Sequence, residues 1–283
     1  MILFKEAAGL AKHLRQLKLE GARIGFVPTM GALHAGHISL IEKSKSTCDV
    51  TVSSVFVNPT QFNDPGDFKK YPVTITDDLL LLTNVDCDIL FLPSVEEIYP
   101  DGTATTDHYN LGEIEFVLEG KFRPGHFQGV CQVVHRLLDI VLPADLFMGQ
   151  KDYQQCLVVK QLVQLINFPV NIIIVDTYRE VSGLAMSSRN LRLSEKQQQD
   201  AVAISKMLQY IKANYTTASF SELETYATDH LLASGFNKVD YISIVDAETM
   251  QPARVASEGR KLVALIAAFI GDVRLIDNVV LQR

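Results

Sequence analysis

Two histidines in the segment His34-Ala35-Gly36-His37 stand at the junction of a predicted strand and a predicted helix. The mostly apolar residues 23–27 predict the strand, and the helix is expected to begin at about Gly36. The first turn of a helix offers unpaired backbone N–H groups and the positive end of the helix dipole, and glycine lets the backbone approach a ligand closely. This segment therefore suits a phosphate group.

His34 and His37 lie three residues apart, so in a helical turn they project to the same side and can both donate to phosphate oxygens. A neutral histidine can donate such a hydrogen bond, and a protonated one can offset charge that develops on phosphorus. The alternatives are two loop histidines satisfied by the backbone, or a metal site. Without a third Cys, His or carboxylate nearby, the pair makes a poor zinc site.

Asn58 and Gln61 follow the apolar residues 50–57. We expect them at the carboxyl end of the second strand, where open α/β sheets bind ligands. Their neutral amides can hold a hydroxy acid. An ordinary polar turn set by Asn58 and Pro59 is the alternative.

A second strand-to-helix turn follows the predicted strand at residues 144–148. In this turn Lys151 can place a mobile ammonium against a phosphate, and Asp152 can accept from a ribose hydroxyl or cap the helix. The turn can meet the His34 segment in one cleft.

The segment of residues 186–190 combines two hydroxyls with a guanidinium, from Ser187, Ser188 and Arg189. Together they form a compact set of donors for a triphosphate. A serine pair before a helix is more often a cap, so capping is the competing interpretation.

Strands and helices are predicted to alternate through the first part of the chain, which is typical of an α/β fold with a Rossmann-like, doubly wound parallel sheet. Apolar positions over residues 130–141 recur at three- and four-residue spacing, which indicates an amphipathic helix. After residue 177 the pattern changes to two helices and two strands, which predicts a smaller C-terminal α+β domain. We therefore expect domains at residues 1–177 and 178–283. The predicted strands are residues 23–27, 50–57, 88–92, 144–148, 170–175, 238–245 and 261–269, and the later helices begin at residue 194 and span residues 220–233.

Composition excludes several classes of protein. The chain has 283 residues, 47% of them hydrophobic, which is ample for a packed core. A net charge of −7 gives no general attraction to nucleic acid, so a polyanion such as ATP needs local donors. The longest apolar run, residues 262–270, is far shorter than the ~20 residues of a membrane span, and the N-terminus turns charged too early for a signal peptide. The four cysteines form no C-x-x-C pair, which favours reduced thiols in the cytoplasm.

Residues 28–37 (PTMGALHAGH) contain the H-x-G-H signature of the nucleotidylyltransferase superfamily and class I aminoacyl-tRNA synthetases, and the whole segment resembles the pantothenate synthetase family. Four further segments match that family in order and spacing across the chain. They are residues 56–62 (FVNPTQF), 122–130 (FRPGHFQGV), 149–155 (GQKDYQQ) and 183–190 (GLAMSSRN).

The resemblance implies an ATP-dependent ligase that condenses pantoate with β-alanine through a pantoyl-adenylate and releases pyrophosphate and AMP. It also implies a homodimer. By the same resemblance the catalytic residues are His34, His37 and Lys151, and the residues that bind pantoate and β-alanine are Asn58, Gln61 and Gln155. The ATP-binding residues are Met30, Gly31, His34, Gly36, His37, Gly149, Lys151, Asp152, Tyr178, Met186, Ser187, Ser188 and Arg189. Residues 186–189 resemble the K-M-S-K-S loop of the synthetases, which is expected to close over the ATP phosphates.

Mg²⁺ is expected to bridge phosphate oxygens with few protein ligands. Asp77 and Asp78 can assist it, although two exposed carboxylates at the start of a helix are the alternative. The family resemblance also implies that Arg123 and His126 shape the active-site wall or a subunit contact, and a surface loop before a helix is the alternative.

Three positions depart from the family pattern: Tyr178, Ser182 and Val73 stand where an aliphatic residue, an aspartate and an arginine are usual. The adenine pocket is the part of the site most affected. None of the three is a donor that we assign to the chemistry.

A nucleotidylyltransferase is the alternative enzyme class. It needs a cationic site for a second phosphate, whereas this chain offers neutral amides. A tRNA partner is disfavoured by the acidic charge, and a non-catalytic nucleotide-binding module ought to lack one of the phosphate donors.

Overall fold

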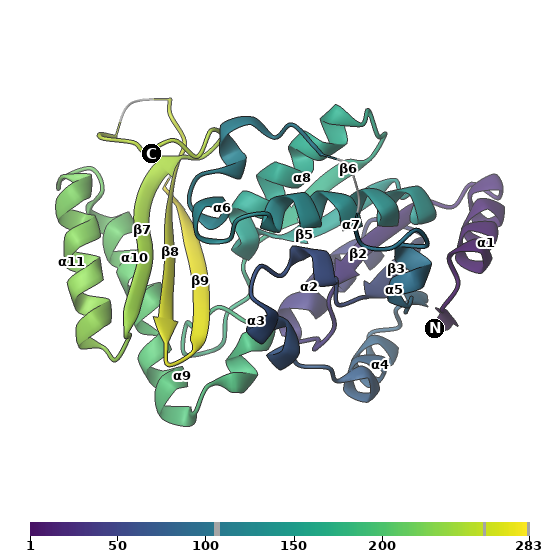
Figure 1. The fold of residues 1–283 in the computed structure, drawn as a ribbon, viewed down its shortest axis with the longest axis horizontal. Helices are drawn as coiled ribbons and strands as arrows, with labels where there is room; N and C mark the ends of the chain where they lie inside the picture. The colour runs from purple at the N-terminus through teal and green to yellow at the C-terminus, as the bar shows by residue number, and fades with distance from the viewer. Residues whose placement is uncertain (105–107, 257–258, 282–283) are drawn as a thin grey trace.

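The structure is a computed structural model that describes residues 1–104, 108–256 and 259–281. Its larger part is a six-stranded parallel sheet with the strand order β1-β4-β3-β2-β5-β6 (Figure 1). The strands are β1 (Ile2–Phe4), β2 (Ile24–Thr29), β3 (Val50–Val55), β4 (Ile89–Phe91), β5 (Asp145–Gly149) and β6 (Asn171–Val175). Five of them confirm the predicted strands to within two residues at each end, and β1 was not predicted.

Helices cover both faces of this sheet, as a doubly wound fold requires. Helices α1 (Ala7–Leu19), α7 (His126–Val141) and α8 (Tyr153–Leu165) pack on one face, and α2 (Ala35–Lys45) and α4 (Ile75–Asn84) pack on the other. Successive strand residues point to opposite faces, so Phe26 joins the first core and Val27 the second. Burial on both faces explains why the central strands are mostly apolar, although β3 also holds the buried Thr51, Ser53 and Ser54.

The chain order reverses at the centre of the sheet. Strand β2 pairs with β3 on one side and with β5 on the other, with Phe26 opposite both Val52 and Leu146. Ligands bind open α/β sheets at such a reversal, outside the carboxyl ends of the strands. Helix α2 follows β2 at this place, and the 3-10 turn η3 (Gln150–Asp152) follows β5.

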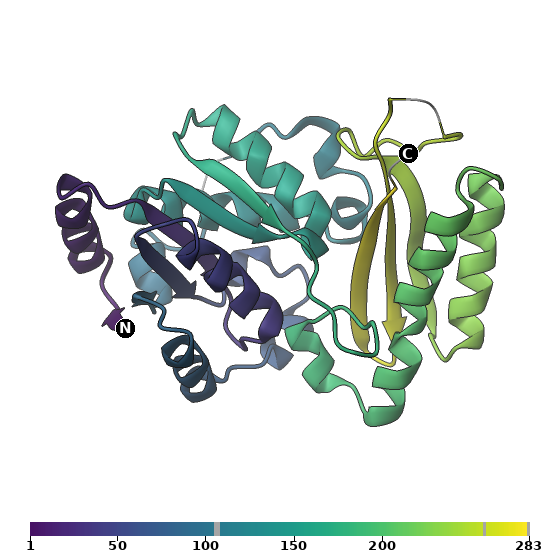
Figure 2. The same ribbon diagram turned by 180° about the vertical axis from the view of Figure 1, so that it is seen from behind.

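A separate antiparallel sheet forms the C-terminal part, from β7 (Lys238–Asp246), β8 (Leu262–Ile270) and β9 (Val273–Leu281). Helices α10 (Ala203–Asn214) and α11 (Phe220–Ala233) cover one face of it, and Figure 2 shows its other face turned toward the parallel sheet. Strand β8 is buried on both faces, because Ala264 packs under the helices and Leu265 packs against the core of the parallel sheet. The predicted fold class, an α/β part with a smaller α+β part, is confirmed.

Short elements complete the chain. They are η1 (Pro59–Gln61), α3 (Pro65–Lys70), α5 (Val95–Ile98), η2 (Gly112–Glu115), α6 (Glu119–Phe122), η4 (Ser188–Arg192) and α9 (Glu195–Ala201). Within the described ranges, no helix has the length and apolarity of a bilayer span.

Strand β9 is the main element that the sequence did not predict. It follows β8 after the two-residue turn Gly271-Asp272, and it carries Arg274, Asp277 and Asn278 among apolar residues. Asp and Asn are depleted in strands, which weakens the local pattern. These polar residues are satisfied by partners far away in sequence: Arg274, for example, donates to both carboxylate oxygens of Glu119 at 2.8 and 2.7 Å.

Candidate active site

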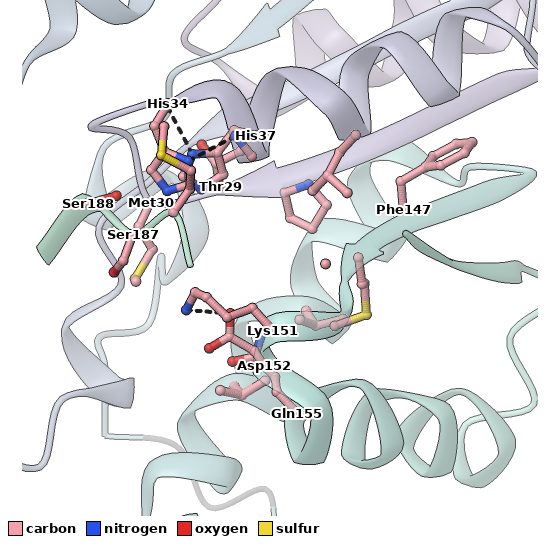
Figure 3. A pocket seen from close by; sticks show the side chains of 18 of the residues that line it. Thr29, Met30, His34, His37, Phe147, Lys151, Asp152, Gln155, Ser187 and Ser188 are labelled. Carbon is pink, nitrogen blue, oxygen red and sulfur yellow. Dashed lines mark hydrogen bonds and ion pairs between the residues drawn. The ribbon is translucent and has the colours of Figure 1, made fainter. Parts of the chain in front are cut away.

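A cleft opens at the reversal point between the carboxyl ends of β2 and β5 (Figure 3). The start of α2 supplies one wall, the η3 turn supplies the opposite wall, and residues 186–189 come from the C-terminal part of the chain. Fifteen of the predicted site residues line this cleft, namely Met30, His34, Gly36, His37, Asn58, Gln61, Gly149, Lys151, Asp152, Gln155, Tyr178, Met186, Ser187, Ser188 and Arg189. Gly31, Asp77 and Asp78 do not; Gly31 and Asp78 line a separate pocket behind the loop.

The two histidines hold each other and the helix end in a fixed arrangement. His34 is the N-cap of α2, where its Nδ1 accepts from the Gly36 N–H at 3.1 Å, and Nδ1 of His37 accepts from the His34 N–H at 3.3 Å. Their ring centroids lie 4.0 Å apart, so the two rings share one side as predicted. An Nδ1 that accepts carries no proton, so each neutral ring bears its proton on Nε2. Both rings line the cleft, and both therefore offer an N–H donor there.

Gly36 makes this arrangement possible. A Cβ at this position would lie 2.9 Å from Cε1 of His34, closer than side chains pack. The glycine therefore lets the His34 imidazole lie over the first turn of the helix. From the sequence we expect a ligand to approach the backbone closely at Gly36, and in the structure the His34 ring makes this close approach.

Burial keeps both histidines neutral. It lowers the pKa of His34 to about 4, with Lys151 adding to the effect, and it lowers the pKa of His37 well below the ordinary value, helped by His34 and Lys151. Of the two roles that the sequence allowed, the geometry and the pKa direction favour a neutral donor over a charged one.

These shifts predict a loss of stability in mild acid. His34, His37 and His126, whose pKa burial lowers to about 3, bind fewer protons in the folded state than the unfolded chain binds near pH 5. Stability therefore rises with pH in this window: the contribution is complete above about pH 6.5 and is lost progressively as the pH falls toward about 4. Urea unfolding at pH 7, 6 and 5 should give a falling free energy of unfolding. A constant or rising value would contradict buried neutral histidines.

The loop before His34 is braced by Asp78, which corrects the expectation of an exposed carboxylate. Asp78 is 2% exposed; its Oδ2 accepts from the Ala32 N–H at 3.0 Å and its Oδ1 from the Leu33 N–H at 2.7 Å. Thr74 donates a further hydrogen bond at 3.1 Å. Ala32 has a left-handed φ of +46°, a conformation that a non-glycine residue holds only where its surroundings impose it. Asp78 is thus committed to the protein's own backbone.

Replacing Asp78 by alanine should destabilise the fold, because it leaves two buried N–H groups without acceptors. Each such group costs on the order of 1–3 kcal/mol. Asp77 is the matched control, since it is exposed in the same helical turn and its removal should cost less than about 1 kcal/mol. Denaturant unfolding of Asp78→Ala and Asp77→Ala measures the difference, and equal losses would contradict the bracing role.

The two predicted acid-binding amides play different parts. Asn58 is 1% exposed and fully engaged: its Oδ1 accepts from Tyr99 Oη at 2.9 Å, and its Nδ2 donates to the Gly129 carbonyl at 3.1 Å and to Gln61 Oε1 at 3.3 Å. Asn58 therefore orients Gln61. Tyr99 is a contributor that the sequence did not reveal, because the two residues lie 41 positions apart and no local pattern links them.

The backbone around Gln61 is fixed from the α7 side. His126 donates from Nδ1 to the Gln61 carbonyl at 2.8 Å, and its Nε2 accepts from Arg123 at 3.1 Å. A Cβ at Gly129 would lie 2.2 Å from the Thr60 carbonyl oxygen, so only glycine allows α7 to pack this close. Arg123 and His126 do not line the cleft themselves, and they support it only through the backbone of Gln61. Their role in a subunit contact stays a prediction.

Lys151 lies opposite the histidines in the cleft (Figure 3). Its Nζ is 3.3 Å from Oδ2 of Asp152. The alternative of Asp152 as a helix cap is not realised, because its side chain makes no capping hydrogen bond to α8. Gln155 lies one turn further along and is half-buried, and its side chain makes no hydrogen bond to any part of the chain that the structure describes.

Residues 186–189 line the cleft, and Ser187 among them also caps the 3-10 helix η4. Ser187 Oγ accepts from the Arg189 N–H at 3.3 Å, which is the capping geometry, and Ser188 Oγ donates to the Ala32 carbonyl at 3.0 Å. Arg189 donates to Asp67 at 2.7 Å and lies over the ring of Tyr71. Asp67 was not predicted, since 122 residues separate it from Arg189.

The three departures from the family pattern occupy unremarkable surroundings. Tyr178 is 48% exposed at the edge of the cleft, Ser182 accepts from the Leu184 N–H at 3.3 Å, and Val73 is exposed. None of them blocks the cleft.

Comparison with known proteins agrees with this geometry. The family model described as pantoate–β-alanine ligase matches residues 2–280. The chain is 43% identical to the pantothenate synthetases of Cytophaga hutchinsonii and Leptospira biflexa, over 99% of this chain and 99% of each relative.

Solved structures of similar proteins superpose over the whole chain. Pantothenate synthetase from Thermus thermophilus aligns with a TM-score of 0.89 and 39% identity over 99% of both chains. The pantoate–β-alanine ligase from Francisella tularensis, described as complexed with β-γ ATP and β-alanine, aligns with a TM-score of 0.81 and 39% identity, covering 99% of this chain and 97% of that one. With a family model, curated relatives and solved structures all matching over the full length, the chain belongs to the pantoate–β-alanine ligase family.

Proposed function

We propose that the cleft between β2 and β5 carries out the ligase reaction with the residues that line it. In the first step the pantoate carboxylate attacks the α-phosphorus of ATP, and pyrophosphate leaves. In the second step the amine of β-alanine attacks the acyl carbon of the pantoyl-adenylate, AMP leaves, and the nitrogen loses a proton. The observation that carries the proposal is the placement of two neutral N–H donors opposite one ammonium in a single cleft.

The first step brings two anions together, so its barrier depends on donors that are already in position. Nε2–H of His34 and of His37 donate to oxygens of the α-phosphate, and Lys151 approaches from the other wall. Donors fixed before the reaction need no reorganisation as charge develops. Holding both reactants in line can itself lower the barrier by roughly 7–11 kcal/mol.

The acid-binding side is proposed to use Gln61 and Gln155, with Asn58 as the residue that orients Gln61. Gln61 Nε2 lies 2.8 Å from Met30 Sδ, a weak acceptor that a carboxylate or hydroxyl of pantoate can replace. Neutral amides hold a hydroxy acid without a second cationic site, which favours a carboxylate substrate over a phosphate ester.

Mg²⁺ is proposed to arrive with ATP and to neutralise charge on the phosphate oxygens. Among residues 1–104, 108–256 and 259–281 no group of three His, Cys, Asp or Glu side chains is arranged as a metal site. Asp78 is held by backbone N–H groups, and neither it nor Asp77 lines the cleft. The carboxylates that do line it are Asp152 and Asp176, so these are the protein groups that fit the ion's outer ligands.

We further propose residues 1–177 and 178–283 as the two domains, with the second acting as a lid on the ATP phosphates. In a closed state Arg189 would exchange Asp67 for a phosphate oxygen, since both are anionic partners of the guanidinium. A homodimer and a cytoplasmic location complete the proposal. Light scattering tests the former, and the four unpaired cysteines support the latter.

The reaction is tested by following pyrophosphate release with ATP and Mg²⁺, first with pantoate alone and then with β-alanine added. Adenylation predicts pantoate-dependent pyrophosphate release, and AMP with pantothenate only when both acids are present. If AMP and amide formation do not depend on the two acids, the proposal is wrong. Pyrophosphate release with a phosphate ester in place of pantoate would instead support a nucleotidylyltransferase.

A further inference from the structure

Two neighbouring residues of the last strand, Asp277 and Asn278, reach both halves of the cleft from outside it. Both are buried, at 4% and 2% exposure. Successive residues of a strand point to opposite faces, so the two side chains contact different segments. Neither was singled out by the sequence.

Asn278 holds the turn that carries Lys151. Its Nδ2 donates to the carbonyl oxygen of Gln150 at 3.0 Å and to that of Lys151 at 2.9 Å, and its Oδ1 lies 3.3 Å from Nε2 of Gln150. The turn has only three residues, and 3-10 geometry gives poorer internal hydrogen bonds than an α-helix. Two bonds from one buried amide therefore fix the backbone from which the Lys151 ammonium extends.

Asp277 holds the segment that leads to residues 186–189. Its two oxygens accept from Arg179 at 2.6 and 3.0 Å, and Arg179 in turn donates to the Gly183 carbonyl at 3.2 Å. Arg179 also bridges to Ala185, directly before Met186. The Asp277 carboxylate thus anchors the base of the loop that carries Ser187, Ser188 and Arg189.

We propose that Asp277 and Asn278 are positioning residues that set the separation between Lys151 and the loop of residues 186–189. The inference rests on the phosphate-binding role proposed above for Lys151. One rigid strand that is bonded to both segments keeps the two sets of donors in register, which a flexible lysine side chain cannot do alone. Misplacement of a catalytic group by about 1 Å can cost on the order of 10²-fold in rate.

The test compares Asn278→Ala, Lys151→Ala and the double variant in pantoate-dependent pyrophosphate release at saturating ATP. Asn278→Ala should lower kcat by about tenfold or more. The KM for pantoate should change by less than about twofold, because Gln61 lies on another segment and Gln155 lies within α8, beyond the turn that Asn278 holds. If Asn278 acts through Lys151, the double variant should be no slower than Lys151→Ala alone.

A matched control separates positioning from general destabilisation. Asp246 is a buried carboxylate at the end of β7 in the same sheet, it is paired with Arg260 at 2.7 Å, and it does not line the cleft. Asp246→Ala should lose thermal stability yet keep the wild-type kcat at a temperature where it is folded. The near-isosteric Asn278→Leu removes both donors without a large cavity or a buried charge, and it should repeat the kcat loss even if Asn278→Ala does not fold.

The outcomes distinguish the two levels of inference. Wild-type kcat in Lys151→Ala would overturn the proposed role of Lys151 and the positioning role with it. A slow Lys151→Ala beside a wild-type kcat in Asn278→Leu would overturn only the positioning role. Multiplicative losses in the double variant would also overturn it, because they would mean that Asn278 acts independently of Lys151.

Discussion

Replacing Lys151 by alanine is expected to lower kcat for pantoate-dependent pyrophosphate release by about 10²–10³-fold, the usual effect of removing one donor to a developing charge. The ammonium lies across the cleft from two uncharged imidazoles, so it is the mobile cation that this wall supplies. Its loss leaves this wall of the cleft without a cation to offset the negative charge that develops on the transferring phosphorus. The measurement is steady-state pyrophosphate release at saturating ATP and pantoate.

Lys160 supplies the matched control, because it lies further along α8 and is exposed to solvent. Lys160→Ala should keep the wild-type kcat, since a surface lysine outside the cleft contributes nothing to the transferring phosphate. Thermal unfolding of both variants should stay close to that of the wild type. A wild-type kcat in Lys151→Ala at saturating substrates would remove Lys151 from the catalytic set.

The elements that position the cleft were predictable because their signals are local. The apolar run before Pro28 and the glycines after it lie close together in the sequence. The strand that ends before Gly149 is likewise followed directly by its turn. A parallel sheet that reverses its strand order must bring the ends of two such strands together. The strand-to-helix turns with His34 and Lys151 therefore follow from the order of the elements alone.

The supporting contacts were not predictable, because each joins residues that are distant in the chain. Asp78 reads as a helix-start carboxylate, and only the fold shows that it accepts from the loop 45 and 46 positions earlier. Asn278 lies 127 positions from the Lys151 carbonyl. It belongs to a strand that the sequence did not predict, because its polar residues weaken the apolar pattern of a strand. Residue types reveal which groups can do chemistry, whereas the fold decides which of their atoms remain free to do it.

Asn58 and Ser188 illustrate that difference. From the sequence we expect both residues to bind substrates. In the structure the side-chain amide of Asn58 is hydrogen-bonded to Tyr99, Gly129 and Gln61. The hydroxyl of Ser188 donates to the Ala32 carbonyl. Their polar atoms orient the cleft from within. Among the residues that the structure describes, Gln61 Nε2 and the two imidazole Nε2–H groups meet at most a weak acceptor, so these are the donors that we propose for the substrates.

Replacing His34 by asparagine should lower kcat by about 10²-fold without loosening the start of α2, because the histidine has two separable tasks. Its Nδ1 caps the helix by accepting from the Gly36 N–H, and its ring, which carries the proton on Nε2, lines the cleft. Asparagine is a favoured N-cap and its Oδ1 can take over the first task, but it has no group that reaches the position of Nε2. His34→Ala loses both, so it should also lose about 0.5–2 kcal/mol of unfolding free energy.

The pair of variants decides between a catalytic donor and a loop histidine that only satisfies the backbone. If capping were the whole role, His34→Asn would keep the wild-type kcat and only His34→Ala would fall. The ratio of wild-type to His34→Asn kcat should also stay constant between pH 6 and pH 8, because burial holds the His34 pKa at about 4 and the ring is neutral throughout this range. A ratio that declines as the pH rises through 6.5 would mean that the charged imidazolium acts, and it would contradict the neutral donor that the Gly36 hydrogen bond requires.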